Sequence, residues 1–250
     1  MYDWNRLVGW ARHCSFGLRE EWLQVFIESE NGERREWNLG IKQVESLASW
    51  VKTIGLKEKD GSLTEFGSAL VTGKLSIHDM VFWEIAWVNA AFSFPTARWY
   101  VHSFVGSFTT RELREKLSHA VPRLTDSTVR DAVYELTDLL RKTPIGTGLK
   151  QGIFSKFGNV TNVVRNGIIP SPKVALYAII RLFAEERRDE IGLDEELTWP
   201  WVIFNVPKDE ILRLIVSTQE GAVSFQSNIV RLMAKGEALG KWLDGSMLIT

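Results

Sequence analysis

One stretch of the chain constrains its fold more than any other, the sequence LTDSTVRDAVYELTDLL at residues 124–140. Its apolar residues recur at steps of three and four, a spacing that lines one face of an α-helix. The predicted inward residues are Val129, Ala132, Val133, Leu136, Leu139 and Leu140. The opposite face carries Thr128, Arg130, Tyr134 and Arg141. The stretch therefore predicts an amphipathic helix whose outer face meets DNA, a partner protein or water.

The residues on either side of this helix suggest a helix-turn-helix unit with a wing. Before it, FTTRELREKLSHAV at 108–121 predicts a helix that Thr109 or Thr110 caps and that Pro122 ends. After it, RKTPIGTGLKQGIFSKFG at 141–158 contains proline and glycines that break a helix and suit a loop or a β-wing. We expect residues 107–165 to form a winged-helix-like unit.

A similar plan is predicted for residues 1–75. The sequence GIKQVESLASWVKTIGL at 40–56 predicts a helix whose inward residues are Ile41, Val44, Leu47, Ala48 and Val51. Asp60-Gly61 is a strong signal for a tight hairpin turn, because such a turn needs a positive φ angle. A further helix is expected near LTEFGSALV, so this part also reads as a winged-helix-like unit.

The remaining segments complete a mainly α (α+β) fold with two winged helix-turn-helix-like units and a helical C-terminal region. Residues 76–106 are expected to form buried connecting helices, with SIHDMVFWEIAWVNAAF closed by Phe94-Pro95. Residues 166–250 form the C-terminal region, with helices predicted for SPKVALYAIIRLFAEERRDEIG, KDEILRLIV and SNIVRLMAKGEALGKWL. Eleven tryptophans among 250 residues provide large anchors for a buried core.

Composition limits the class of protein. The net charge is −1, but residues 98–165 hold 11 Lys/Arg and 6 Asp/Glu, whereas the segments on either side are net acidic. Cys14 is the only cysteine, which excludes an intramolecular disulfide and fits a reducing cytoplasm. The start lacks the apolar core of a signal peptide, and the most apolar run is broken by Glu84 and Asn89. We therefore expect a cytoplasmic protein with no membrane partner.

Two groups of residues are candidates for contact with duplex DNA. In the basic middle segment they are Thr128, Arg130, Tyr134, Arg141, Lys142, Lys150 and Lys156, since a winged helix needs cations and hydroxyls on its exposed helix and wing. Asp131, Glu135 and Asp138 lie on the same helix and would repel phosphate. In the first unit the candidates are Lys42 and Gln43, but the surrounding acidic residues favour a scaffold role there.

Signals for catalysis are weak. The four histidines show no HExxH or other close ligand spacing, and no GxxxxGK[ST] phosphate loop occurs. His13 and Cys14 could be imagined as a nucleophile pair, but neighbouring residues on a helix point about 100° apart, which favours a buried structural role. We expect no catalytic residue, no metal and no cofactor, which leaves a nuclease or nucleotide-processing enzyme as a distant third interpretation.

Several stretches together resemble an uncharacterised prokaryotic domain family found in gene clusters for DNA phosphorothioation, a sulfur modification, and in related phage-defence systems. They are HCSFGLREEWL, LGIKQVESLASWVKTIGL, LTEFGSALV, DMVFWEIAWVNAAF, ARWYVHSFVGSFTTREL and STVRDAVYELTDLL, with weaker similarity in IPSPKVALYAI and WPWVIFNVPKDEIL. The chain departs from the family pattern after Leu39-Gly40, where a Gly-Lys-Asn-like insertion is absent and Lys42-Gln43 stand nearest to it. The resemblance implies a modification and restriction system, with DNA or a sulfur-modification or defence protein as partner.

Together these features predict a non-enzymatic DNA-binding or DNA-targeting component of a phage-defence system. The alternative is a protein-interaction adaptor that holds a DNA-modification enzyme and uses the winged-helix folds only as scaffold. The acidic run from Glu185 to Glu196 supports this alternative, because it repels nucleic acid and attracts a basic partner.

Overall fold

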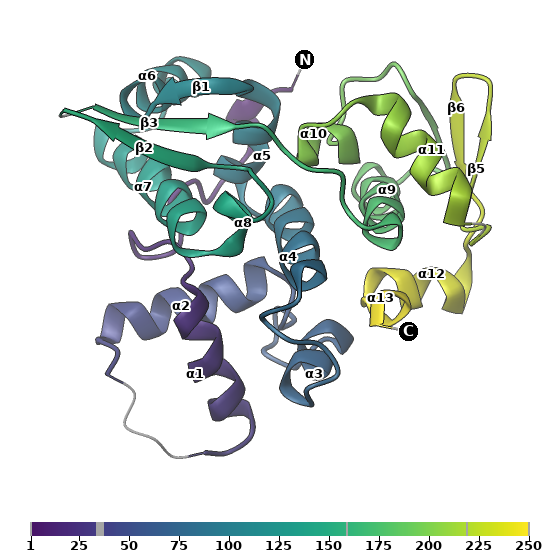
Figure 1. Ribbon diagram of the computed structural model, residues 1–250, viewed down its shortest axis with the longest axis horizontal. Helices are drawn as coiled ribbons and strands as arrows, with labels where there is room; N and C mark the ends of the chain where they lie inside the picture. The colour runs from purple at the N-terminus through teal and green to yellow at the C-terminus, as the bar shows by residue number, and fades with distance from the viewer. Residues whose placement is uncertain (1, 34–37, 159, 219, 250) are drawn as a thin grey trace.

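The computed structural model describes residues 2–33, 38–158, 160–218 and 220–249. Within these residues helices predominate, and they are joined by two antiparallel sheets of three strands each, which confirms the mainly α (α+β) fold class. The sheet formed by β1 (Gly106–Thr109), β3 (Val160–Arg165) and β2 (Ile153–Phe157) lies at the upper left of Figure 1, and the hairpin of β5 (Val223–Gln226) and β6 (Ile229–Leu232) lies at the right edge of the picture. Helix α4 (Met80–Ser93) runs between these two regions.

The N-terminal part is helical. Its elements are the short 3-10 helix η1 (Trp4–Arg6) and the helices α1 (Glu20–Glu30), α2 (Ile41–Thr53) and α3 (Glu65–Val71). The hairpin predicted around Asp60-Gly61 is reduced to one isolated β-bridge between Lys57 and Leu63. Gly61 supplies the positive φ angle of the turn, at +96°.

The predicted inward face of α2 is confirmed for two of its five residues. Leu47 and Val51 are buried, whereas Ile41 and Val44 are 80% and 51% exposed and Ala48 is also exposed. The first two turns of α2 therefore present apolar side chains on the outside, which helical periodicity alone cannot distinguish from a core face.

Helix α4 forms the buried centre of the molecule, as the sequence predicted. The two polar residues that interrupt its apolar run are both used by the fold. Glu84 accepts hydrogen bonds from the backbone N–H and the hydroxyl of Ser171, at 3.0 and 2.7 Å. Asn89 donates to the Ile54 carbonyl and accepts from the Tyr177 hydroxyl. These bonds tie α4 to the N-terminal part and to the beginning of the C-terminal region.

The first sheet belongs to a unit that starts with α5 (Pro95–Ser103). The further elements are β1 (Gly106–Thr109), α6 (Thr110–Ala120), α7 (Asp126–Lys142), α8 (Pro144–Thr147), β2 (Ile153–Phe157) and β3 (Val160–Arg165). The strand order is β1-β3-β2, with Val163 of β3 opposite Phe108 and Phe154. Thr109 caps α6 in a capping box with Glu112, which confirms one of the two predicted caps.

The C-terminal region contains a second unit with the same order of elements except for the short α8, which has no counterpart among its described residues. Its elements are α9 (Pro172–Glu186), β4 (Glu190–Gly192), α10 (Pro200–Phe204), α11 (Lys208–Thr218), β5 (Val223–Gln226) and β6 (Ile229–Leu232), followed by α12 (Gly236–Leu243) and α13 (Ser246–Ile249). The strand order β4-β6-β5 repeats that of the first sheet.

The sequence analysis predicted one helix over SNIVRLMAKGEALGKWL, and its first part is wrong. Val230 and Leu232 are buried while Ile229 and Arg231 between and beside them face outward, so the side chains alternate with a period of two. Strand β6 occupies this stretch, and α12 begins only at Gly236.

Arg165, at the end of β3, joins the two sheet-containing units. Its guanidinium is buried and donates hydrogen bonds to five acceptors: the carbonyls of Val101, Phe104, Val202 and Ile203 and the side chain of Gln151. Burial lowers the pKa of Arg165 to about 10, so the group stays charged at neutral pH. Arg165 is therefore a structural cation and not part of the exposed basic surface.

Candidate nucleic-acid interface

The exposed face of α7 is arranged as the sequence predicted, except at Thr128. Its six inward apolar residues are all buried, and Arg130, Tyr134 and Arg141 are exposed. These three residues share one side of the helix, because steps of four and eleven residues return to nearly the same angle at about 100° per residue. Arg130 and Arg141 are separated by eleven residues, or roughly 16 Å along the axis. The face is long enough to follow one side of a DNA groove.

Two of the three carboxylates expected to repel DNA from this helix do not face solvent. Glu135 accepts backbone hydrogen bonds from His13 and Ser15, at 3.0 and 3.1 Å, and Asp138 accepts one from Gly17 at 3.3 Å. Both side chains are buried under the segment 10–19. Of the opposing acids only Asp131 remains near the outer face, where it pairs with Arg130 at 3.1 Å.

The packing of segment 10–19 against α7 was not predicted from the sequence. Gly17 is the residue that makes it possible, since a Cβ atom there would lie 2.1 Å from the backbone nitrogen of Leu139. A side chain at position 17 would push the segment away from the helix and would uncover Glu135 and Asp138. The only sequence signal for this packing is the glycine itself, and it does not indicate which helix the segment would contact.

His13 lies at the centre of this contact. Its Nδ1 is 2.9 Å from Glu135 Oε2 and its Nε2 is 2.9 Å from the Thr53 hydroxyl. The ring stacks on Trp50 at 3.6 Å between centroids and meets the edge of Phe94. Burial lowers the pKa of His13 to about 2 and raises that of Glu135 to about 7, because both charged forms are poorly solvated there.

The Thr53-His13-Glu135 arrangement has the order of a catalytic relay, but its surroundings favour a structural role. All three side chains are buried, and aromatic rings cover two sides of the imidazole. Cys14, the other member of the imagined nucleophile pair, is partly exposed, and its thiol lies 3.7 Å from Glu45. Burial and the nearby Glu45 raise the pKa of the thiol, which disfavours the thiolate needed for nucleophilic chemistry.

The end of α7 and the region after it contribute further exposed cations. The Arg141 guanidinium lies over the ring of Phe154 on β2, 4.6 Å from its centroid, so the end of α7 is linked to the strand. Lys142, Lys150 and Lys156 are exposed, and their side chains make no hydrogen bond or ion pair within the described ranges. Lys156 sits on β2 opposite Thr161. These lysines are free to meet an anionic partner.

Three candidates from the sequence lie elsewhere. Thr128 points to a different side of α7 from Arg130, and its N–H and hydroxyl both meet the capping hydroxyl of Thr125. Gln43 uses its side-chain oxygen to accept from the Gly40 N–H at 3.0 Å, at the start of its own helix. Lys42 is exposed on α2, which Figure 1 places in the lower half of the molecule, away from the β2–β3 hairpin.

The charge excess of residues 98–165 survives folding. Burial removes Arg98 and Arg165 from the surface, and it also removes Glu135 and Asp138. Two charges of each sign are lost. The 11 cations and 6 carboxylates of the sequence therefore become 9 and 4, and the excess of cations is unchanged. The exposed surface of this unit is therefore relatively more basic than its sequence.

No group of three or more His, Cys, Asp or Glu residues is placed to hold a metal ion in the described part of the chain. No helix among those residues is long and apolar enough to cross a membrane.

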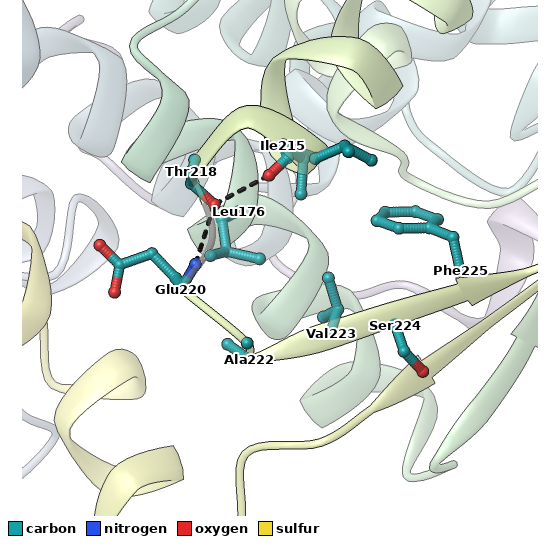
Figure 2. A pocket seen from close by; sticks show the side chains of 10 residues that line it. Leu176, Ile215, Thr218, Glu220, Ala222, Val223, Ser224 and Phe225 are labelled. Atoms are coloured by element: carbon teal, nitrogen blue, oxygen red, sulfur yellow. Dashed lines mark hydrogen bonds between the residues drawn. The ribbon is translucent and has the colours of Figure 1, made fainter.

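A cavity of about 360 Å³ lies between α11 and β5 (Figure 2). The Thr218 hydroxyl beside it donates to the Ile215 carbonyl and accepts from the Glu220 N–H, so its hydrogen bonds are already made within the fold.

Comparison with solved structures found the same fold in SspB. The magnesium ion-bound crystal structure of SspB has a TM-score of 0.65 at 15% sequence identity, covering 96% of this chain and 86% of that one. A second SspB crystal structure has a TM-score of 0.67 at 14% identity, covering 97% and 87%. At these identities the likeness is one of fold. No protein-family model and no curated protein sequence matched the chain.

Proposed function

We propose that this protein is a non-enzymatic DNA-binding component of a DNA phosphorothioation or related phage-defence system and acts in the cytoplasm. The observation that carries the proposal is the exposed basic surface of residues 98–165, formed by one face of α7 and by the lysines beside and on β2. The likeness in fold to SspB, a protein of phosphorothioation gene clusters, supports the context.

In this proposal residues 95–165 act as a winged-helix unit on duplex DNA. Apart from the four-residue α8, the order helix, strand, helix, helix, strand, strand fits such a unit, with α7 as the helix that enters the major groove. Arg130 and Tyr134 would face base edges or the sugar-phosphate backbone, and Arg141 would be held in place by Phe154. Lys142, Lys150 and Lys156 would contact phosphates, which adds affinity without reading sequence.

Burial of Glu135 and Asp138 is essential to this mechanism. A carboxylate on the flank of a groove-binding helix would repel phosphate and weaken binding. Because segment 10–19 takes up both groups, the outer side of α7 keeps its cations and loses most of its opposing charge. Segment 10–19 thus removes negative charge from the side of α7 that lies away from the proposed DNA-contacting residues.

Reversal of charge tests the proposal. Arg130, Lys142 and Lys150 changed together to Glu should abolish or strongly weaken binding to a duplex, and the slope of log K against log salt should fall by about one for each lost phosphate contact. The matched control reverses Lys173, Arg187 and Arg213 in the C-terminal unit, which makes the same change in net charge. Equal loss of affinity in both triple variants would refute a local interface on residues 98–165.

The adaptor function has its own supporting observation. The run from Glu185 to Glu196 is largely exposed, and its carboxylates outnumber Arg187 and Arg188. Such a surface attracts a basic protein and repels DNA. An adaptor with the DNA-binding unit used as scaffold would leave duplex affinity at background level in the wild type, while a partner from the same gene cluster would still be retained in a pull-down.

A further inference from the structure

An aromatic cavity opens beside the acidic run, where the N-terminal segment, α5 of the first unit and the C-terminal unit meet. Its volume is about 480 Å³, and it is lined by residues of the N-terminal segment, the end of α5 and the stretch 193–202. The aromatic residues lining it are Tyr2, Trp4, His102, Trp199 and Trp201. The acidic residues lining it are Asp194, Glu195 and Glu196.

The aromatic walls are held in fixed positions. Tyr2 stacks on Trp4 at 4.9 Å between centroids and also contacts His102 at 4.5 Å. Its hydroxyl and the His102 Nε2 both meet the buried Thr198 hydroxyl, at 2.8 and 3.2 Å. On the other side Trp199 and Trp201 stack at 4.6 Å with nearly parallel rings. The cavity is therefore built before any ligand enters it.

The electrostatics of this cavity favour a cation. Burial lowers the pKa of His102 to about 4, so the imidazole is neutral at neutral pH and does not repel one. Glu195 is already paired with Arg188 at 2.8 Å. Asp194 is exposed and makes no side-chain hydrogen bond or ion pair with the described residues. A free carboxylate thus stands at the edge of a cluster of aromatic faces.

The protein already places one of its own cations against this cluster. The Lys208 ammonium lies 5.6 Å from the centroid of the Trp201 ring and donates to the Leu193 carbonyl at 2.9 Å. Trp201 and Leu193, which this ammonium contacts, both line the cavity. This contact is independent of the acidic run, and it shows that the aromatic wall interacts favourably with positive charge.

We propose that this aromatic cavity binds an arginine side chain of a protein partner. A guanidinium is planar, stacks on tryptophan and tyrosine faces, and forms hydrogen bonds to a carboxylate at the same time. Asp194 would accept those hydrogen bonds while the ring of Trp4, which Tyr2 covers on one side only, stacks on the flat face and Trp201 contacts the guanidinium through its edge. This contact rests on the adaptor function, for which it would supply a defined binding site. It does not depend on the DNA interface on residues 98–165.

The test uses the full chain and small probes. N-acetyl-arginine methylamide is titrated against the 15N-labelled protein, and the indole N–H signals of Trp4 and Trp201 are followed by NMR. The neutral isostere N-acetyl-citrulline methylamide and the lysine analogue are titrated in parallel. We expect saturable shifts with the arginine probe and at least about fivefold weaker binding of the other two, because citrulline has no positive charge and lysine has no planar group that stacks and forms two hydrogen bonds at once.

Asp194→Asn should weaken the arginine probe by at least about fivefold, while Glu237→Gln on α12 should leave it unchanged. Asn at this exposed position preserves size, and unchanged indole signals outside the cavity report that the variant is folded. Absence of a saturable shift, equal binding of citrulline or lysine, or an unaffected Asp194→Asn variant would each overturn the proposal. Duplex affinity measured on Asp194→Asn should equal the wild type, and the triple variant at Arg130, Lys142 and Lys150 should keep arginine binding. Failure of either function is thereby separated from failure of the other.

Discussion

The two sheet-containing units, residues 95–165 and 172–232, have the same order of strands and, apart from the short α8 of the first, the same order of elements. They differ in the third helix of each unit. Helix α7 has 17 residues and is buried along most of its length, whereas α11 has 11 residues, of which only Ile211 and Ile215 are buried. The outer side of the first unit is basic, whereas the second unit carries the acidic run, three of whose carboxylates line the aromatic cavity shared with α5 and the N-terminal segment.

The two units show that different residues determine the topology and the surface charge. The core positions that define the helix order are apolar in both units, but the charge on the outside is free to change sign. In the first unit a segment from far away in the sequence takes up Glu135 and Asp138 and leaves the cations outside. In the described part of the second unit no such segment covers α11, whose first turn carries the exposed Asp209 and the half-buried Glu210.

The largest expected effect concerns the buried side of α7. Leu136→Ala should lower the free energy of unfolding by about 2–5 kcal/mol, because it leaves a cavity among fully buried neighbours. Tyr134→Ala, at a position that is 43% exposed, should cost less than about 1 kcal/mol. Denaturant melts of both variants measure the difference. Similar losses would mean that the tyrosine side of α7 is also packed and is not available to DNA.

The next largest effect concerns the carboxylate that segment 10–19 covers. In the native state burial raises the pKa of Glu135 to about 7, while the unfolded chain has the ordinary value near 4.5. Between these two pH values the native protein holds a proton that the unfolded chain has lost, so stability falls as the pH rises from about 4.5 to about 7. The full change is on the order of 3 kcal/mol.

Glu135→Gln removes this titration. We expect the variant to gain stability relative to the wild type between pH 5 and pH 8, on top of a constant difference from the altered hydrogen bonds. Urea melts at both pH values give the comparison, and Glu115→Gln on the exposed side of α6 is the matched control. A difference between wild type and Glu135→Gln that does not change with pH would show that the carboxylate is solvated and that α7 is not covered as described.

The sequence predicted the helices well and the long-range contacts poorly, for physical reasons. The period of apolar residues in α7 and the cap of α6 are local signals, and both agree with the structure. Periodicity predicts helix at β6, because its four residues of alternating burial are too few to outweigh the helical pattern that follows. The burial of Glu135 and the cavity around Tyr2 depend on residues more than a hundred positions apart, which no local pattern records.

The smallest expected effect separates the two units most directly. Lys156 is exposed on β2 and makes no side-chain contact by hydrogen bond or ion pair among the described residues, so Lys156→Gln should change stability by less than about 0.5 kcal/mol. If Lys156 meets a phosphate, the salt slope of duplex binding should fall by about one, with affinity reduced several-fold at low salt. Lys173→Gln at the start of α9 makes the same chemical change in the other unit and should leave the slope unchanged. A reduced slope in Lys173→Gln together with an unchanged one in Lys156→Gln would move the electrostatic contact to the C-terminal unit and reverse the roles assigned to the two halves.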